Sequence, residues 1–98
     1  MFIITVTYAR PLAEIDQHMS GHIAFLDKYY KAGKIIFSGK QQPRTGGVIL
    51  VHQTTEKEIN QMLAEDPFQQ LSLATYSVME VVPTKWDKRF DHFIERPQ

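Results

Sequence analysis

The chain contains no cysteine in its 98 residues. This absence excludes a disulfide framework, a zinc site with thiolate ligands, a cysteine nucleophile and a thiol redox switch. Long apolar runs are also missing, since threonines interrupt the N-terminal stretch MFIITVTY. No segment approaches the roughly 20 apolar residues of a membrane-spanning helix, and the start lacks the basic region of a signal peptide. We therefore expect a cytoplasmic protein without a membrane partner.

Neither sign of charge is in excess. Eleven Lys and Arg balance eleven Asp and Glu, and the densest basic cluster, KWDKR near the C-terminus, contains an aspartate. Nucleic acids and anionic membranes attract proteins through surplus positive charge, so we expect neither as a partner. A content of 43% hydrophobic and 22% charged residues is typical of a globular protein, and the length suits one domain, residues 1–98.

Alternating and helical periodicities divide the chain into strands and helices. Residues 2–8 alternate between two faces, which predicts a strand. Residues 14–32 carry apolar side chains at spacings of three and four, which predicts one helix that ends before Gly33. The same rules predict these further elements: strands at 34–38 and 47–52 joined by a loop, a helix from Thr55 to near residue 65, a break at Asp66-Pro67, and a strand at 73–82.

The order of these elements, β-α-β-β-α-β, predicts an α+β domain of the ferredoxin-like class. Such a domain has a four-stranded antiparallel sheet with two helices on one face. Neither an internal repeat nor a linker divides the chain. Residues 84–98 follow as a C-terminal extension in which Trp86, Phe90 and Phe93 recur at helical spacing, so we expect an amphipathic helix or turn there.

Both faces of the predicted sheet carry apolar side chains. In the first strand Ile3 opposes Phe2 and Ile4, and residues 48–51 of the third strand are all apolar. Two helices cover only one face, and a large exposed apolar patch is rare on a monomer. We therefore expect a homodimer, or a higher homo-oligomer, with sheet packed on sheet. The alternative is that the C-terminal extension folds back over the open face.

Two histidines four residues apart, His18 and His22, lie on the predicted first helix, where a metal site would place two ligands. The residues between them supply no carboxylate, which disfavours a metal site. His22 lies on the apolar stripe, and a buried ring needs partners for its nitrogens. One interpretation is a core histidine bonded to a backbone carbonyl. His52 and His92 are expected to be exposed.

The other interpretation gives His22 a carboxylate partner. Asp66 is the candidate, because it follows the second predicted helix and the two helices lie side by side on the sheet. An aspartate that accepts one ring N–H fixes the tautomer and leaves the other nitrogen basic. Asp66 also precedes Pro67, where it would cap a short turn at residues 67–70. The two roles of this aspartate are compatible.

One series of residues matches a known family in order and spacing: His22, Phe25-Leu26, Gly33, Ser38-Gly39, Pro43, Gly46-Gly47, Asp66-Pro67-Phe68, Ala74, Tyr76-Ser77-Val78, Glu80 and Pro83. From Met1 to about Lys85 the chain thereby resembles the YciI-related proteins, small members of the dimeric α+β barrel superfamily. The resemblance implies a cleft with a His–Asp pair and a nearby serine, here His22, Asp66 and Ser38. One YciI-like protein is a dehydrochlorinase that acts on a chlorinated hydroxyquinol without a cofactor, so we expect none here.

The resulting hypothesis is a cofactor-independent enzyme that carries out an elimination or an isomerisation on a small organic substrate. His22 would act as general base, Asp66 would orient it, and Ser38 would bind a developing oxyanion. Three further residues are expected to contact the substrate: Gly39 through its backbone amide, Arg44 by holding an anionic group of the substrate, and Tyr76 from the pocket wall. Arg44 is equally compatible with a solvated loop charge.

A non-catalytic protein is the alternative. It would be a dimeric module that binds a small ligand or has a structural role, and its His22–Asp66 pair would only fix the packing. Haem binding by distant relatives with this fold would add His18 or His22 as an axial ligand. Absorbance of the purified protein in the Soret region tests haem binding.

Overall fold

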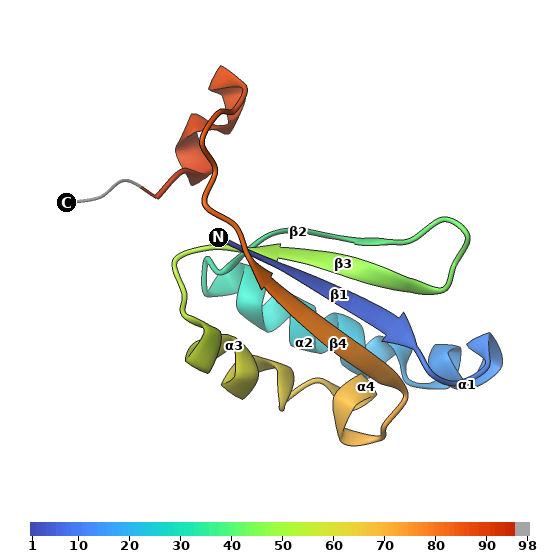
Figure 1. The fold of residues 1–98 in the computed structure, drawn as a ribbon. Helices are drawn as coiled ribbons and strands as arrows, with labels where there is room; N and C mark the ends of the chain where they lie inside the picture. The colour runs from blue at the N-terminus through green and yellow to red at the C-terminus, as the bar shows by residue number, and fades with distance from the viewer. Residues whose placement is uncertain (96–98) are drawn as a thin grey trace.

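A computed structural model describes residues 1–95 of the chain. Four strands form one antiparallel sheet in the order β2-β3-β1-β4 (Figure 1). Their bounds are β1 (Phe2–Tyr8), β2 (Ile35–Lys40), β3 (Gly46–Val51) and β4 (Ala74–Glu80). The first strand is therefore central, and the two strands that follow the helices, β2 and β4, lie at the edges. This arrangement confirms the predicted ferredoxin-like α+β class.

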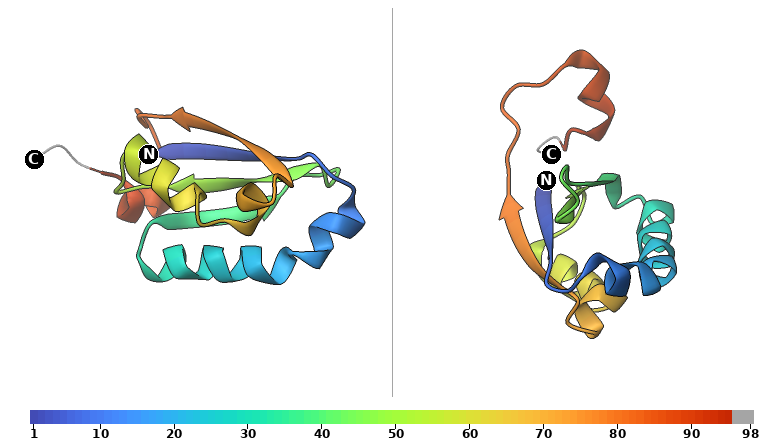
Figure 2. Two further views of the ribbon diagram at one scale, coloured as in Figure 1. Left: turned by 90° about the horizontal axis from the view of Figure 1, so that it is seen from below. Right: turned by 90° about the vertical axis from the view of Figure 1, so that its right-hand side faces the viewer.

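The four α-helices formed within residues 1–95 lie on one side of the sheet (Figures 1 and 2). The longer two are α2 (Met19–Lys31) and α3 (Glu56–Leu63), and the short ones are α1 (Leu12–Gln17) and α4 (Pro67–Gln70). The layers enclose a core of buried side chains: Phe2, Ile4, Val6, Ile15, Phe25, Ile35, Ile49, Val51, Ile59, Met62, Leu63, Phe68, Leu73 and Ala74. Within residues 1–95, no helix has the length and apolar character needed to cross a bilayer.

Two sequence signals mark the helix ends correctly. The Thr55 side chain accepts a hydrogen bond from the backbone N–H of Glu58 at 3.2 Å, which starts α3 as predicted. Gly33 follows α2 with a φ of 75°, a left-handed conformation that favours glycine. The chain therefore turns into β2 at the position that the sequence indicates.

The single helix predicted at residues 14–32 is two helices. A break at His18, with φ −113° and ψ 9°, separates α1 from α2, and α1 begins directly after Pro11. The apolar stripe still faces the core, since Ile15 is fully buried and Met19 packs against the buried cluster. Apolar spacing reports which face of a helix is buried, and a bend that keeps the same side turned inward leaves that spacing intact.

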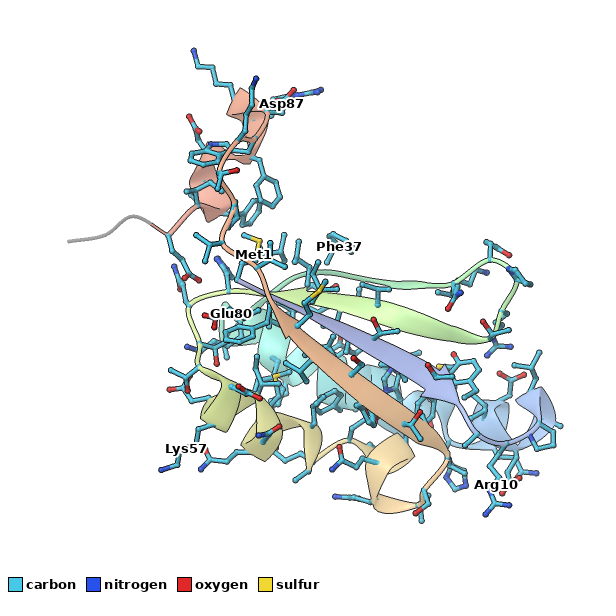
Figure 3. The ribbon with its side chains drawn as sticks, in the orientation of Figure 1. Met1, Arg10, Phe37, Lys57, Glu80 and Asp87 are labelled. Atoms are coloured by element: carbon cyan, nitrogen blue, oxygen red, sulfur yellow. The ribbon has the colours of Figure 1, made fainter. Side chains whose placement is uncertain are left out.

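The face of the sheet opposite the helices carries exposed apolar side chains. Strand register places Ile3, Leu50, Phe37 and Met79 together on this face. Phe37 is 50% exposed and Met79 is 54% exposed, and Figure 3 shows the Phe37 side chain on the side away from the helices. The predicted open apolar face is therefore present in the single chain.

The C-terminal segment contacts one end of the sheet. Its 3-10 helix spans Lys88–Phe93, and the Phe93 ring packs on the ring of His52, with centroids 5.8 Å apart. The carboxylate of Glu95 lies 3.8 Å from the N-terminal amine. His52 is only 8% exposed, so the prediction that it is exposed was wrong: the tail covers it. In Figure 1 this segment stands beyond the end of the strands and does not lie along the open face.

Candidate functional site

Asp66 is the buried centre of the candidate site. It directly precedes α4, and its Oδ1 accepts the backbone N–H of Phe68 at 3.1 Å, while Pro67 occupies the first helical position. The side chain has no exposed surface. The predicted capping role of Asp66 is therefore present, and it holds the carboxylate in one orientation beneath α2.

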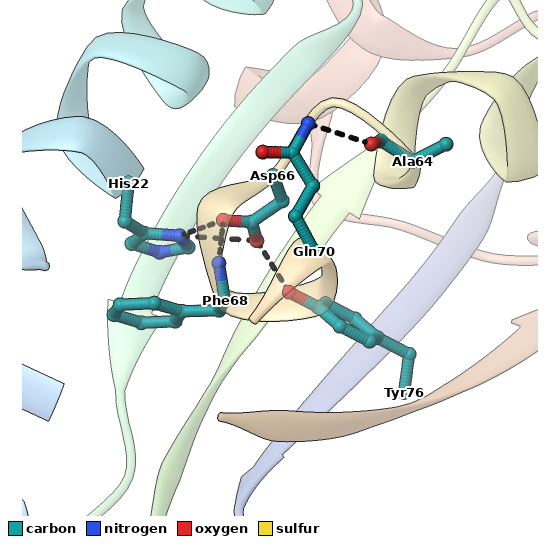
Figure 4. Close-up of polar contacts among 6 residues, drawn as sticks. All are labelled: His22, Ala64, Asp66, Phe68, Gln70 and Tyr76. Carbon is teal, nitrogen blue, oxygen red and sulfur yellow. Dashed lines mark hydrogen bonds and ion pairs between the residues drawn. The ribbon is translucent and has the colours of Figure 1, made fainter. Parts of the chain in front are cut away.

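His22 on α2 meets this carboxylate. Its Nδ1 lies 2.9 Å from Oδ1 and 3.1 Å from Oδ2 of Asp66 (Figure 4). Because an ionised carboxylate only accepts, Nδ1 carries the proton and Nε2 keeps its lone pair. Within residues 1–95, each buried side-chain nitrogen and oxygen has a hydrogen-bond partner. Nε2 of His22, whose side chain is 13% exposed, makes no hydrogen bond within these residues and is open to the pocket. The His22 ring is thus held with Nδ1 at Asp66 and with Nε2 on the side of the pocket.

Tyr76 completes the surroundings of the carboxylate. From β4 its hydroxyl donates to Oδ2 of Asp66 at 2.5 Å (Figure 4). Burial raises the pKa of Tyr76, and the hydrogen bond to Asp66 and the charge of that carboxylate raise it further, so the phenol remains a donor through the neutral range. The sequence predicted a substrate contact for Tyr76. The structure directs its hydroxyl to Asp66 and places the residue on a different cleft, between α3 and β4.

A pocket of about 340 Å³ opens beside His22, between α2 and the β2–β3 hairpin. Its lining comprises Val6, Tyr8, Met19, His22, Ile23, Leu26, Ser38, Gly39, Lys40, Arg44, Gly47, Val48, Ile49 and Phe68. The volume is in the range of small-molecule sites. Of the predicted site residues, His22, Ser38, Gly39 and Arg44 line this pocket, whereas Asp66 and Tyr76 lie behind the histidine.

Ser38 brings a hydroxyl pair to the pocket. Its Oγ lies 2.7 Å from the hydroxyl of Tyr30 on α2. Two hydroxyls that share one hydrogen bond keep one further proton between them, and that proton is available to a ligand oxygen. Gly39 follows on the pocket wall, with open space where a side chain would begin. When Tyr30 is the donor of the shared bond, the free proton is that of Ser38, which lines the pocket.

Arg44 is held at the pocket by an ion pair. Its Nη2 lies 2.5 Å from Oδ1 of Asp16, and its guanidinium lies 5.9 Å from the centre of the Tyr8 ring. The hydrogen bond from Arg44 holds the pKa of Asp16 below its ordinary value. Arg44 therefore has features of both predicted alternatives: it lines the pocket, and its charge is paired with that of Asp16.

His18, the other histidine considered for a metal site, does not line this pocket. His18 lies at the break between α1 and α2, and its backbone carbonyl accepts the N–H of His22 at 3.2 Å. Within residues 1–95, no group of three or more His, Asp or Glu side chains is arranged to hold a metal ion.

Sequence reasoning missed two residues that shape the pocket. The Phe68 ring stacks on His22, with centroids 4.2 Å apart and planes 3° apart, and the Lys40 side chain lines the pocket wall. Signals for both were available. Phe68 lies two residues after Asp66, and Lys40 lies two residues after Ser38, on the same face of a strand.

Comparison with known proteins gives a family and a fold. The family model of the YCII-related domain matches residues 1–85. A solved structure with a similar fold is 5-chloro-2-hydroxyhydroquinone dehydrochlorinase (TftG) from Burkholderia phenoliruptrix AC1100, in complex with 2,5-dihydroxybenzoquinone. The TM-score is 0.68, the identity is 19%, and the similarity covers 83% of this chain and 93% of that chain. Comparison with the sequences of curated proteins finds none that matches.

Proposed function

The chain belongs to the family of YCII-related domains, and we propose that it is an enzyme in which His22 removes a proton from a small organic substrate. The observation that carries this proposal is the hydrogen bond of 2.9 Å between His22 Nδ1 and a fully buried Asp66, with Nε2 facing a pocket. A base held in one tautomer beside a pocket is the arrangement that general base catalysis requires.

The proton transfer follows from the positions of the side chains. Nε2 of His22 takes a proton from a C–H or O–H of the substrate, and the electron pair moves toward a substrate oxygen. The carboxylate of Asp66 stabilises the imidazolium that forms. Ser38 donates a hydrogen bond to the oxygen on which negative charge develops. In an elimination the leaving group departs as an anion and His22 returns its proton to water. In an isomerisation His22 returns it to another substrate atom.

The pocket wall favours ring compounds. Phe68 stacks on His22, and the apolar residues Met19, Leu26 and Ile49 line the same space. The solved structure of TftG, the dehydrochlorinase with a similar fold, contains a six-membered ring compound, 2,5-dihydroxybenzoquinone. This likeness and the acid–base geometry support an elimination or isomerisation on a cyclic substrate. The steps proposed above use side chains alone and require no cofactor.

A screen of cyclic substrates followed by two variants tests the proposal. The screen includes 5-chloro-2-hydroxyhydroquinone, with chloride release as the readout, and hydrogen–deuterium exchange for other cyclic C–H acids. On any compound that is turned over, His22→Asn is expected to lower kcat by about 10²–10⁴-fold. Asp66→Asn keeps an N-cap side chain but no longer fixes the tautomer, so kcat falls while the fold remains.

One measurement tests the same geometry without a substrate. The ¹⁵N chemical shifts of the His22 ring are expected to show a protonated Nδ1 and an unprotonated Nε2 in the neutral form. The opposite tautomer, or turnover by His22→Asn within about threefold of the unmodified protein, would overturn the assignment of His22 as the base.

We further propose that two chains associate through the open faces of their sheets. The exposed Phe37 and Met79 support this, together with Ile3 and Leu50 on the same face. Burial of such a patch is favourable by roughly 25 cal/mol per Å² of apolar surface. Sedimentation velocity is expected to show a dimer, and Phe37→Glu is expected to shift it toward monomer. A monomeric unmodified protein at all tested concentrations would reject the association.

A further inference from the structure

The pocket beside His22 is lined by charge of one sign. Lys40 and Arg44 are cationic, and none of the lining residues, which all lie within residues 1–95, is acidic. Asp66 does not face the pocket and already accepts hydrogen bonds from His22, Phe68 and Tyr76. We propose that the substrate is a compact anion, a ring-sized molecule with a carboxylate or another anionic oxygen held by Lys40 together with Arg44. This inference rests on the proposed function, because it names the substrate class of the same pocket.

Strand register directs Lys40 toward the pocket. On β2, Ser38 pairs with Ile49 and Lys40 pairs with Gly47 of β3. Ile49 is buried on the face that the helices cover, so Ser38 and Lys40, two residues apart, project to that face. Within residues 1–95 Lys40 takes part in no ion pair, unlike Lys28 or Arg44. Its ammonium group is therefore available to an anionic ligand.

Arg44 supplies a second, more rigid set of donors. Its side chain is 30% exposed, and Asp16 engages two of its nitrogens, Nη2 at 2.5 Å and Nη1 at 3.4 Å. A guanidinium has five N–H donors, so an ion pair with one carboxylate leaves donors unused. Because the ion pair also fixes the side chain, less conformational entropy is lost when an anion binds. Lys40 thus contributes the unpaired charge, and Arg44 contributes oriented donors.

The remaining polar groups suit a substrate with oxygen atoms. The hydroxyl pair of Ser38 and Tyr30 has a proton to donate, and Tyr8 presents a further phenol. The nitrogen base of the pocket is Nε2 of His22. A substrate that fits has acceptor oxygens for the donors, one acidic proton for His22, and a carbon ring against Phe68 and Leu26.

The proposal is tested with two probes that differ in charge and have similar shape, benzoate and benzamide. Backbone amide shifts are followed by ¹H–¹⁵N NMR in the full chain. Benzoate is expected to bind about tenfold more tightly than benzamide, which corresponds to about 1.4 kcal/mol. Raising the salt from about 0.01 M to about 1 M shortens the Debye length from about 30 Å to about 3 Å and is expected to remove most of this preference.

Charge-matched variants locate the effect. Lys40→Met is expected to reduce the ratio of the two affinities to about one or two, since its ammonium supplies the unpaired charge. Lys57→Met makes the same change of net charge on the exposed outer side of α3 (Figure 3), and the tenfold ratio is expected to persist. Equal binding of both probes, absence of saturable benzoate binding, or a ratio that survives Lys40→Met would each overturn the proposal.

The outcome is separable from that of the proposed function. His22→Asn leaves both cations in place, so the preference for benzoate is expected to persist in that variant. If this preference is found and His22→Asn still turns over a substrate, the anion site stands and the base assignment falls. If His22→Asn abolishes turnover but charge makes no difference to binding, the base assignment stands and the substrate class falls.

Discussion

A side-chain carbon at Gly21 would lie 3.1 Å from Cγ of Pro67, so helices α2 and α4 touch at a position where only a hydrogen atom fits without adjustment. The two residues are the chain neighbours of His22 and Asp66. The closeness of the backbones at this point therefore sets how near the imidazole comes to the carboxylate.

Gly21→Ala is expected to change stability little but to disturb the site. Replacing a helical glycine with alanine gains about 0.5–1 kcal/mol of helix stability, which the new contact with Pro67 offsets. The added methyl pushes α4 away by a few tenths of an ångström and lengthens the His22–Asp66 hydrogen bond, so kcat falls and the ¹⁵N shift of Nδ1 moves.

The exposed Ala24 of the same helix is the control for Gly21→Ala. Ala24→Gly is expected to cost about 1 kcal/mol in denaturant unfolding through helix propensity alone, with the His22 shifts unchanged. A gain of a full kcal/mol in Gly21→Ala with an unaltered ring spectrum would show that the contact imposes nothing on the site.

Tyr76→Phe removes the hydroxyl that donates to Oδ2 of Asp66. The buried carboxylate then loses one of its donors, and the free energy of unfolding is expected to fall by about 1–3 kcal/mol. Tyr30→Phe removes the hydroxyl that bonds Ser38 at a 39%-exposed residue, where water replaces it, so its loss of stability is expected to stay below about 1 kcal/mol. Chemical denaturation of both variants checks this. Equal losses would mean that the Tyr76–Asp66 bond has no special weight.

Phe68→Leu removes the ring that stacks on His22 and also contacts the Tyr8 ring edge-on. We expect a loss of about 1–2 kcal/mol in unfolding free energy and a weaker pocket affinity for ring compounds. Phe25→Leu truncates a ring of similar burial in the same core. It is expected to cost similar stability and to leave ring binding intact, because Phe25 is outside the pocket lining. Loss of binding in both variants would argue against a specific role for the stacked ring.

Tyr29 makes stability depend on alkaline pH. Burial, and the hydrogen bond to Glu65, raise the pKa of Tyr29 from 10.0 to about 12. A pKa that is higher in the folded state stabilises the fold fully below the unfolded value, and this contribution is lost as pH rises through the folded value. The stability difference between the unmodified protein and Tyr29→Phe is therefore expected to shrink between pH 10 and about 12.

The carboxylate on the other side of this bond gives the opposite dependence. The hydrogen bond from Lys28, and that from Tyr29, lower the pKa of Glu65 below 4.5. A lowered pKa stabilises the fold above the unfolded value, and the contribution disappears as pH falls through the folded value. Urea unfolding of Glu65→Gln beside the unmodified protein checks this. A difference that grows on acidification below pH 4.5 would contradict the assignment.

Most of the fold was predictable because its signals are local. The alternation of residues 2–8 matches β1, the Thr55 cap starts α3, and the aspartate before Pro67 starts α4. The break at His18 was not predicted, since an apolar stripe that stays on one face carries no mark of a bend. The burial of His52 was missed for a different reason: the chain that covers it lies 41 residues away in sequence.

By itself, the sequence determined the element order, the ferredoxin-like class and the short set of polar residues from which a site could be made. Periodicity and capping act over a few residues, so they can be read from the chain. Only the tertiary structure decided that the hydroxyl of Tyr76 donates to Asp66, that the Phe68 ring stacks on His22, and that Lys40 lines the same pocket as His22 and Phe68. These contacts join residues that are up to 46 positions apart, and their distances depend on how helices and strands pack, which no local pattern encodes.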